Sequence, residues 1–389
     1  MQCTTEVPEV RETNQEQVQS LYRLLRQVPD QRHKRGRRYE AATVLVILLL
    51  AKLAGERTLS GVAQWARLRA SWLQEQLGVK RLPCANTYAY ICAHLDAVAL
   101  NAQLREYFAD HGLPLAPGEL LHWAVDGKVI RGSHRQSPTP QGGQEVLGVY
   151  AVAQGYLEHC QPIASKGYEA ATAQAFVAQS DCIGKVITAD ALHTRPHFAR
   201  QVRRQQGEYI LVVKRNRPQV EAEIRQLFAL PSDPKYPVQR VRTVDAGHGR
   251  LTLRQLSTSS ELNLALADEW RDVAQVFLLE RWVTRHGRTP YESVCGLTSL
   301  PAHVAPPAKL LAWVRAHWHI ENRCHWRRDA TLGEDACTVR HRTVATVLSV
   351  LNSAILALLD LRKVENARAA LRTFAAFPEQ ALALLLQPL

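Results

Sequence analysis

Residues 184–216, GKVITADALHTRPHFARQVRRQQGEYILVVKRN, contain two apolar runs separated by an amphipathic segment. The first run, GKVITAD (184–190), is rich in strand-forming residues and ends in an acid, Asp190. The segment at 193–207 has the apolar spacing of a helix, and YILVVKRN (209–216) again resembles a strand. A strand, a helix and a strand in this order predict an α/β fold built around one sheet.

The flanking segments extend this prediction on both sides. Short β-type runs precede it at LHWAVDG (121–127), EVLGVYAVAQ (145–154) and HCQPIAS (159–165). Further strand-like pieces between residues 236 and 300 predict a β-rich insertion, after which the helical period returns. We therefore expect a catalytic core in two parts, 118–235 and 306–362, with the insertion at 236–305.

The two ends of the chain have a different residue pattern from this core. Apolar residues recur at helical spacing from Val18 onward, which predicts an all-helical N-terminal domain at 18–115. Within it, Ser60 is a candidate helix cap, and one long helix is expected to begin at Asn86 or Thr87. Residues 1–17 are a polar tail, and residues 363–389 are expected to form a helical tail.

The charge balance favours an anionic partner. The 389 residues carry 48 Lys and Arg against 36 Asp and Glu, a net charge of +12. Phosphates attract such an excess, although solubility alone is also an explanation. The run RHKRGRR (32–38) holds five of these cations and is either a phosphate-contacting segment or a solvated linker.

Three acids occupy positions that suit the ligands of a metal ion. Asp126 and Asp190 follow apolar runs, so the strand ends would bring them to one edge of the sheet, and a helix carrying Glu321 can pack there. Carboxylate oxygens are the ligands that Mg²⁺ prefers. Taken singly, however, an Asp after an apolar run is more often a turn or helix cap than a metal ligand.

The residues that flank these acids add to the evidence. The segments VDGKVIRGS (125–133), ITADALHT (187–194) and HWHIENRCHW (317–326) resemble the three catalytic motifs of DDE transposases from bacterial insertion sequences, in the branch called H-repeat-associated. The resemblance covers roughly residues 20–362. The chain departs from it at KGYE (166–169), which lacks the Asn usual in that loop, and at Val314 and His317 in the third motif.

The resemblance implies a ribonuclease-H-like core and a transposase that cuts and rejoins DNA. Asp126, Asp190 and Glu321 would hold two Mg²⁺ ions, for which Mn²⁺ can substitute, with His317 and His325 in support. The DNA partners would be the inverted-repeat ends of the element and a target duplex, bound by a homodimer assembled on DNA. The candidate DNA-binding cations are Arg32, Lys34, Arg35, Arg37, Arg38, Lys128, Arg131, Lys214, Arg323, Arg327 and Arg328.

Several residues near the third motif allow two interpretations. Arg328 falls on one helical face with Glu321, His317 and His325, which suits a phosphate contact, but an ion pair with Asp329, Glu334 or Asp335 is the alternative. Trp313, Trp318 and Trp326 are candidates for stacking on an unpaired base or for core packing. His193, His248, His317 and His325 lack the cysteines and spacing of a zinc site.

Two rival functions stay open at this level. One is a DNA-binding regulator that keeps the fold without transposing, and the other is a metal-dependent nuclease without strand transfer. The polar first residues lack the apolar segment of a secretory signal, and the two long apolar stretches are better explained as buried helices than as membrane spans. We therefore expect a cytoplasmic, nucleoid-associated protein without a membrane partner.

Overall fold

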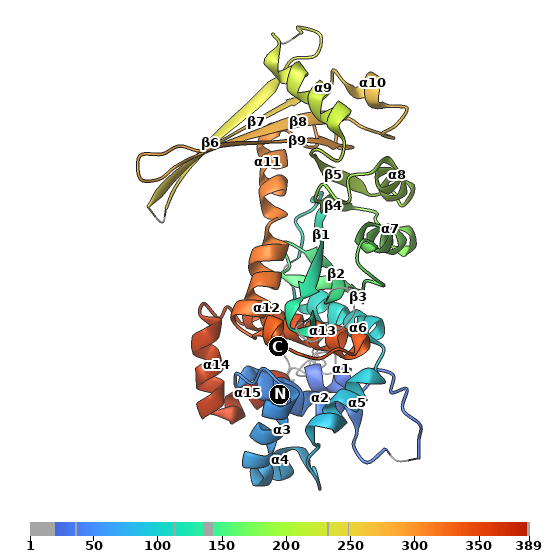
Figure 1. Cartoon of the computed structure of the whole chain (residues 1–389), viewed down its shortest axis with the longest axis vertical. Helices are drawn as coiled ribbons and strands as arrows, with labels where there is room; N and C mark the ends of the chain where they lie inside the picture. The colour runs from blue at the N-terminus through green and yellow to red at the C-terminus, as the bar shows by residue number, and fades with distance from the viewer. Residues whose placement is uncertain are drawn as a thin grey trace, which may run out of the picture.

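The computed structural model describes residues 20–35, 37–112, 114–134, 143–231, 233–247 and 249–386. The expected polar tail at 1–17 and the histidine at 248 lie outside these residues. The molecule is elongated, with a helical N-terminal part at one end and a projecting β-structure at the other (Figure 1). The sheet that carries the candidate acids lies between them.

The N-terminal part is helical, as the apolar spacing predicts. Its helices are α1 (Leu21–Leu25), α2 (Ala41–Leu53), α3 (Leu59–Leu68), α4 (Ala70–Leu77), α5 (Ala85–Ala93) and α6 (Ala97–His111). The cap of α3 is Thr58, not Ser60, because the Thr58 hydroxyl accepts from the Gly61 amide at 3.0 Å. The expected single helix from residue 86 is two helices, since the Asp96 carboxylate caps α6.

One sheet of nine strands runs through the rest of the molecule. The strands are β1 (Leu121–Ile130), β2 (Gln144–Ala151), β3 (Tyr156–Pro162), β4 (Lys185–Ala189), β5 (Glu208–Val213), β6 (Gln239–Gly247), β7 (Arg250–Ser259), β8 (Gln275–Thr284) and β9 (Tyr291–Thr298). Their order is β3-β2-β1-β4-β5-β9-β8-β7-β6. Only the β1–β4 and β4–β5 pairs are parallel.

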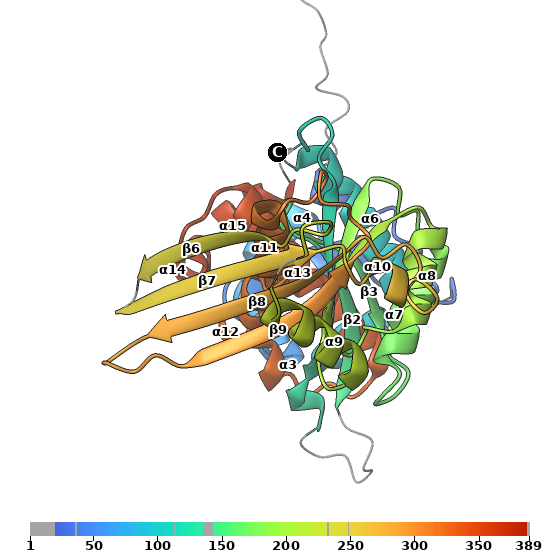
Figure 2. The same ribbon diagram turned by 90° about the horizontal axis from the view of Figure 1, so that it is seen from above.

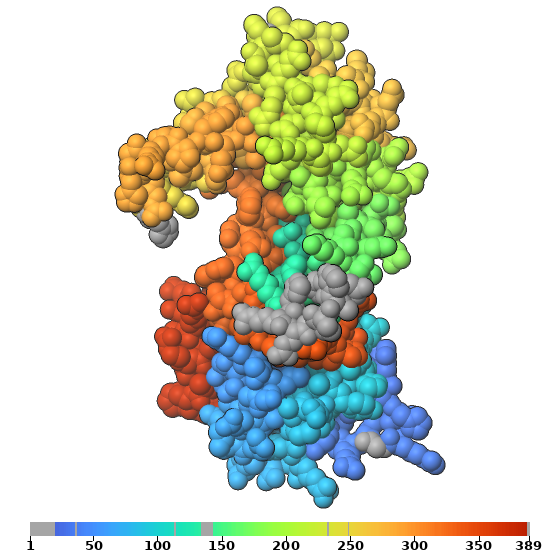
Figure 3. All heavy atoms as spheres, viewed as in Figure 1, coloured from blue at the N-terminus to red at the C-terminus, as the bar shows by residue number. Residues whose placement is uncertain are grey.

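The expected β-rich insertion continues this sheet. Strand β9 pairs with β5 from Ile210 to Val213, so β6–β9 extend the edge of the core sheet as an arm. Seen from above, the arm projects well beyond the helices (Figure 2). The space-filling view shows a hollow between the arm and the C-terminal helices, with α11 (Pro307–Ala316) behind it (Figure 3).

Helices cover the sheet and close the fold. They are α7 (Glu169–Gln179), α8 (Pro196–Arg204), α9 (Pro218–Ala229), α10 (Asn263–Leu266), α12 (Trp326–Ala330), α13 (Arg342–Leu361), α14 (Ala367–Ala376) and α15 (Pro378–Leu386). Helix α13 is long and apolar enough to span a membrane, but 89% of its apolar window is buried inside the fold. It packs against β3, α6 and α5, so it is a core helix that joins the sheet to the N-terminal helices.

Candidate active site

Two of the three acids lie side by side, one on strand β1 and one directly after the neighbouring parallel strand β4. Val125 of β1 is in register with Ala189 of β4, and Asp126 and Asp190 are the next residues on each chain. Strand β1 does not end at Asp126, because it continues to Ile130 by pairing with the longer β2. Asp126 therefore leaves the sheet from the middle of a well-held strand, whereas Asp190 begins a loop.

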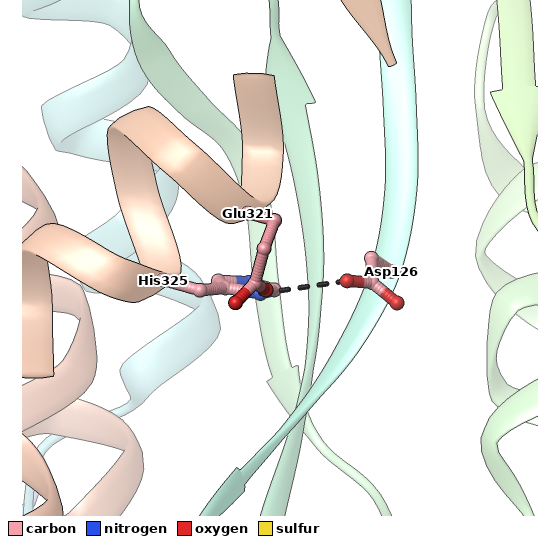
Figure 4. Close-up of side chains that lie close together, drawn as sticks. All are labelled: Asp126, Glu321 and His325. Atoms are coloured by element: carbon pink, nitrogen blue, oxygen red, sulfur yellow. Dashed lines mark hydrogen bonds and ion pairs between the residues drawn. The ribbon is translucent and has the colours of Figure 1, made fainter. Parts of the chain in front are cut away.

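The third acid comes from an irregular helical segment. Residues Ile320–His325 form a π turn between α11 and α12, and Glu321 is its second residue. The His325 Nδ1 atom lies 3.2 Å from Glu321 Oε2 and 3.5 Å from Asp126 Oδ2, so the ring bridges the two acids (Figure 4). π turns are rare and are found frequently at functional sites.

All three acids line one cavity of about 370 Å³. Lys214, His317 and Trp318 also line it, together with apolar side chains of β5, β8, β9 and α11. Asp126, Glu321 and His325 each offer a ligand atom within 4.8 Å of the others. Asp190 stands outside this tight group, and its Oδ1 atom accepts from the Leu192 amide at 2.9 Å.

The electrostatics keep two of the acids ionised. Burial favours the protonated form of Asp126, but the hydrogen bond and charge of His325 outweigh it and lower the pKa of Asp126. The hydrogen bond from His325 likewise holds the pKa of Glu321 below its usual value. Ionised carboxylates beside an imidazole form a donor set that fits a divalent cation such as Mg²⁺ or Mn²⁺.

A row of polar side chains anchors the helix that delivers Glu321. The Thr188 hydroxyl lies 2.9 Å from His317 Nδ1 and 2.7 Å from His122 Nε2. Burial lowers the pKa of His122 to about 3 and also lowers that of His317. Both predicted supporting histidines thus lie at the site. His317 contacts Thr188 of β4, and His325 contacts Asp126 and Glu321.

The cations predicted to bind DNA divide into two groups. One group is buried or half-buried in ion pairs: Arg32 with Asp30, Lys128 with Asp329, Arg327 with Asp360, and Arg328 with Glu334. The other group is exposed and consists of Lys34, Arg35, Arg37, Arg38, Arg131, Lys214 and Arg323, although Arg37 also pairs with Asp30 and Arg131 with Asp335. Burial in a pair leaves Arg32, Lys128 and Arg328 no access to a phosphate, so we assign these three to the fold.

Arg328 does not lie on one helical face with Glu321, although its spacing predicts that it would. Its side chain is fully buried, and its Nε donates to Glu334 Oε2 at 2.8 Å. A π turn closes hydrogen bonds over five residues instead of four, so it rotates the residues after it out of ideal helical register. The break between Glu321 and Arg328 turns the guanidinium into the interior, where the ion-pair alternative holds.

The tryptophans near Glu321 also differ from one another. Trp318 and Trp326 are 62% and 57% exposed, so core packing is not their role. Trp313 is half-buried and packs against the second apolar cluster, with Lys309 over its ring. Trp318 also lines the cavity, and an exposed indole at that place is consistent with contact to a partner.

Sequence reasoning missed Glu169, which lies near the acids. Its Oε1 atom is 2.9 Å from His193 Nε2, and His193 follows Asp190 by three residues. The available signal is the KGYE segment itself, whose acid contacts the loop of the second candidate acid through His193.

The comparisons with known proteins agree with this geometry. Residues 117–358 match the family described as transposase DDE domain, and residues 22–108 match the DDE transposase-associated domain. The chain belongs to the DDE transposase family. That matched domain contains all three acids, the cavity and the projecting arm.

Relatives of this transposase are distant but cover most of its length. It is 22% identical to the candidate transposase YncI of Escherichia coli O157:H7 over 88% of this chain and 87% of that protein. It is 19% identical to the H repeat-associated candidate transposase YhhI of E. coli K12, over 87% and 90%. An uncharacterised protein from the dhlA 3′ region of Xanthobacter autotrophicus is 24% identical over 72% and 93%.

Proposed function

We propose that this transposase cleaves DNA at the ends of its insertion sequence and joins the 3′-hydroxyl ends to target DNA. The observation that carries the proposal is the convergence of Asp126, Asp190 and Glu321 on one cavity from two strands and a helix. The mixed sheet, with Asp126 on β1 between the antiparallel neighbour β2 and the parallel neighbour β4, suits a ribonuclease-H-like core.

The three carboxylates would hold two divalent cations, Mg²⁺ or Mn²⁺. Two such ions about 4 Å apart lower the charge on the attacking and leaving oxygens of a phosphoryl displacement. Asp126 would face both ions, while Asp190 and Glu321 would each complete one. His325 holds the Asp126 and Glu321 carboxylates together, and Lys214 presents a cation to the cavity in which the phosphate would lie.

The remaining parts would serve DNA binding and assembly. We propose residues 18–115 as the end-binding domain, with Lys34, Arg35, Arg37 and Arg38 toward the phosphates. The core at 118–235 and 306–362, the arm at 236–305 and the tail at 363–389 would complete the transposase. The hollow beside the arm is where we place a duplex, and joining two ends favours a homodimer assembled on DNA (Figure 3).

The test compares Asp126→Asn, Asp190→Asn and Glu321→Gln with the wild type. With labelled inverted-repeat ends and Mg²⁺, each variant should lose cleavage while still binding the ends, and Ca²⁺ should support binding without cleavage. Full cleavage by any variant removes that acid from the site.

Two outcomes would identify the rival functions. Cleavage without joined products would indicate a nuclease that lacks strand transfer. End binding by the wild type without any cleavage would indicate a regulator that retains the fold.

A further inference from the structure

Glu169 lies on the far side of the strand that carries Asp126. It is the first residue of α7, and its side chain is 20% exposed. A Cβ atom built on Gly127 would lie 2.4 Å from the Glu169 carboxyl group. The carboxylate therefore packs directly against the β1 backbone, one residue beyond Asp126, in space that only a glycine leaves open.

His193 connects this carboxylate to the loop of the second acid. Its ring is fully buried, and Nε2 lies 2.9 Å from Glu169 Oε1 and 4.0 Å from Asp190 Oδ1. The other ring nitrogen, Nδ1, has no hydrogen-bond partner among the residues that the structure describes. Because a carboxylate oxygen accepts, His193 Nε2 carries a hydrogen and donates it to Glu169.

The Asp190 loop is anchored from two sides. On one side the Thr194 hydroxyl donates to the Val212 carbonyl of β5 at 2.6 Å. On the other side His193 binds Glu169, which rests on β1. Asp190 depends on this anchoring more than the other acids do, because its side chain is half exposed and lies outside the Asp126–Glu321–His325 group.

We propose that Glu169 is a positioning residue that holds the Asp190 carboxylate in place through His193. The inference rests on the proposed function, since it concerns the geometry of the metal ligands. This Glu169–His193 brace connects strand β1, which carries Asp126, to the loop that carries Asp190. The distance between the two acids is therefore set from behind the sheet. Partners behind metal ligands typically change metal affinity or activity roughly 10- to 100-fold when they are removed.

The first test separates the hydrogen bond from the charge. Glu169→Ala should weaken Mn²⁺ binding, measured by calorimetry without DNA, by about 10-fold or more and slow end cleavage by a similar factor. Glu169→Gln, whose amide oxygen still accepts from His193, should restore most of both. Tyr168→Ala removes an exposed neighbouring side chain and should behave as the wild type.

Three results would overturn the brace. They are wild-type Mn²⁺ affinity in Glu169→Ala, equal loss in Glu169→Gln, or a fall in melting temperature that accounts for the whole loss. Asp190→Asn serves as the reference for the proposed function. If Asp190→Asn itself keeps full Mn²⁺ affinity, the metal assignment fails, a result distinct from failure of the brace.

A second variant pair tests the path through Gly127. Gly127→Ala should displace the Glu169 carboxylate and reduce Mn²⁺ affinity, because the new methyl group would clash with it. In the double variant Gly127→Ala/Glu169→Ala the clash is relieved, so the loss should not exceed that of Glu169→Ala alone. Independent, multiplying losses would contradict the proposal.

Discussion

The cation-rich run at 32–38 and the third-motif segment at 317–328 both carry several basic residues but place their charges differently. In the first, Lys34, Arg35 and Arg38 are exposed and only Arg32 is buried. In the second, Arg328 is buried and Arg327 is paired with Asp360, which leaves Arg323 exposed. Burial in an ion pair, with a carboxylate near or far along the chain, separates Arg32 and Arg328 from the cations that remain exposed.

The largest expected effect comes from the buried pair. Arg328→Ala leaves the buried Glu334 carboxyl group without its cation, and removal of one partner of a buried ion pair costs about 3–5 kcal/mol of unfolding free energy. Urea denaturation followed by circular dichroism measures it. Arg323→Ala is the matched control on the same segment and should change stability by less than about 0.5 kcal/mol.

If Arg328→Ala unfolded like the wild type but bound DNA ends weakly, the assignment of Arg328 to the fold would be wrong. Arg328 would then have to leave its pair in the complex.

A smaller effect is expected from pH. Burial favours the protonated form of Glu334, but the charge of Arg328 outweighs it, so the pKa of Glu334 in the folded protein is below its usual value. Because the folded pKa is the lower one, the stabilisation is present above the unfolded pKa, about 4.3, and is lost as the pH falls below it.

The measurement is the melting temperature between pH 7 and pH 3. Glu334→Gln should be less stable than the wild type at pH 7, and the difference should shrink as the pH falls. A constant difference across this range would show that the ionised form of Glu334 is not the stabilising one.

The Arg32→Ala variant should lose stability but not affinity for DNA, unlike variants of the exposed cations in the run. Its guanidinium donates to both Asp30 oxygens at 2.9 and 2.7 Å and to the Tyr39 carbonyl at 2.8 Å. Hydrogen bonds to charged groups contribute roughly 1.5–3 kcal/mol, so Arg32→Ala should lower the unfolding free energy by about that amount. The salt dependence of end binding should stay as in the wild type, and a flatter dependence would move Arg32 to the DNA surface.

The sequence predicted what depends on local pattern. The apolar runs before Asp126 and Asp190 form the neighbouring strands β1 and β4, and the strand-like pieces at 236–300 form β6–β9. It did not predict the π turn at Ile320–His325, because a helix with one extra residue per turn has no distinct local pattern. Without that turn, Arg328 seemed to share a face with Glu321.

The choice among possible partners also depends on tertiary packing. Glu334 was only one of three acids considered for Arg328, and the choice depends on the 3₁₀ turn at Glu334–Ala336 and on Ser349 of α13, whose hydroxyl also binds Glu334. The contact of Glu169 with His193 joins segments 24 positions apart. Such pairs follow from the packing of elements, which spacing along one segment does not encode.

The smallest effect on stability, and the sharpest test of the comparison, belongs to the exposed residues of the run. The triple variant Lys34→Ala/Arg35→Ala/Arg38→Ala removes side chains without a buried ion pair, so its unfolding free energy should stay within about 0.5 kcal/mol of the wild type. If each cation neutralises one phosphate, the slope of log K against log salt should fall by about 0.9 for each lost contact, on every DNA sequence alike. Arg200→Ala/Arg204→Ala on α8 removes two equally exposed cations elsewhere and controls for the change in net charge. An unchanged slope in the triple variant, or an equal fall per residue in the control, would make the run a solvated linker and leave end binding to other surfaces.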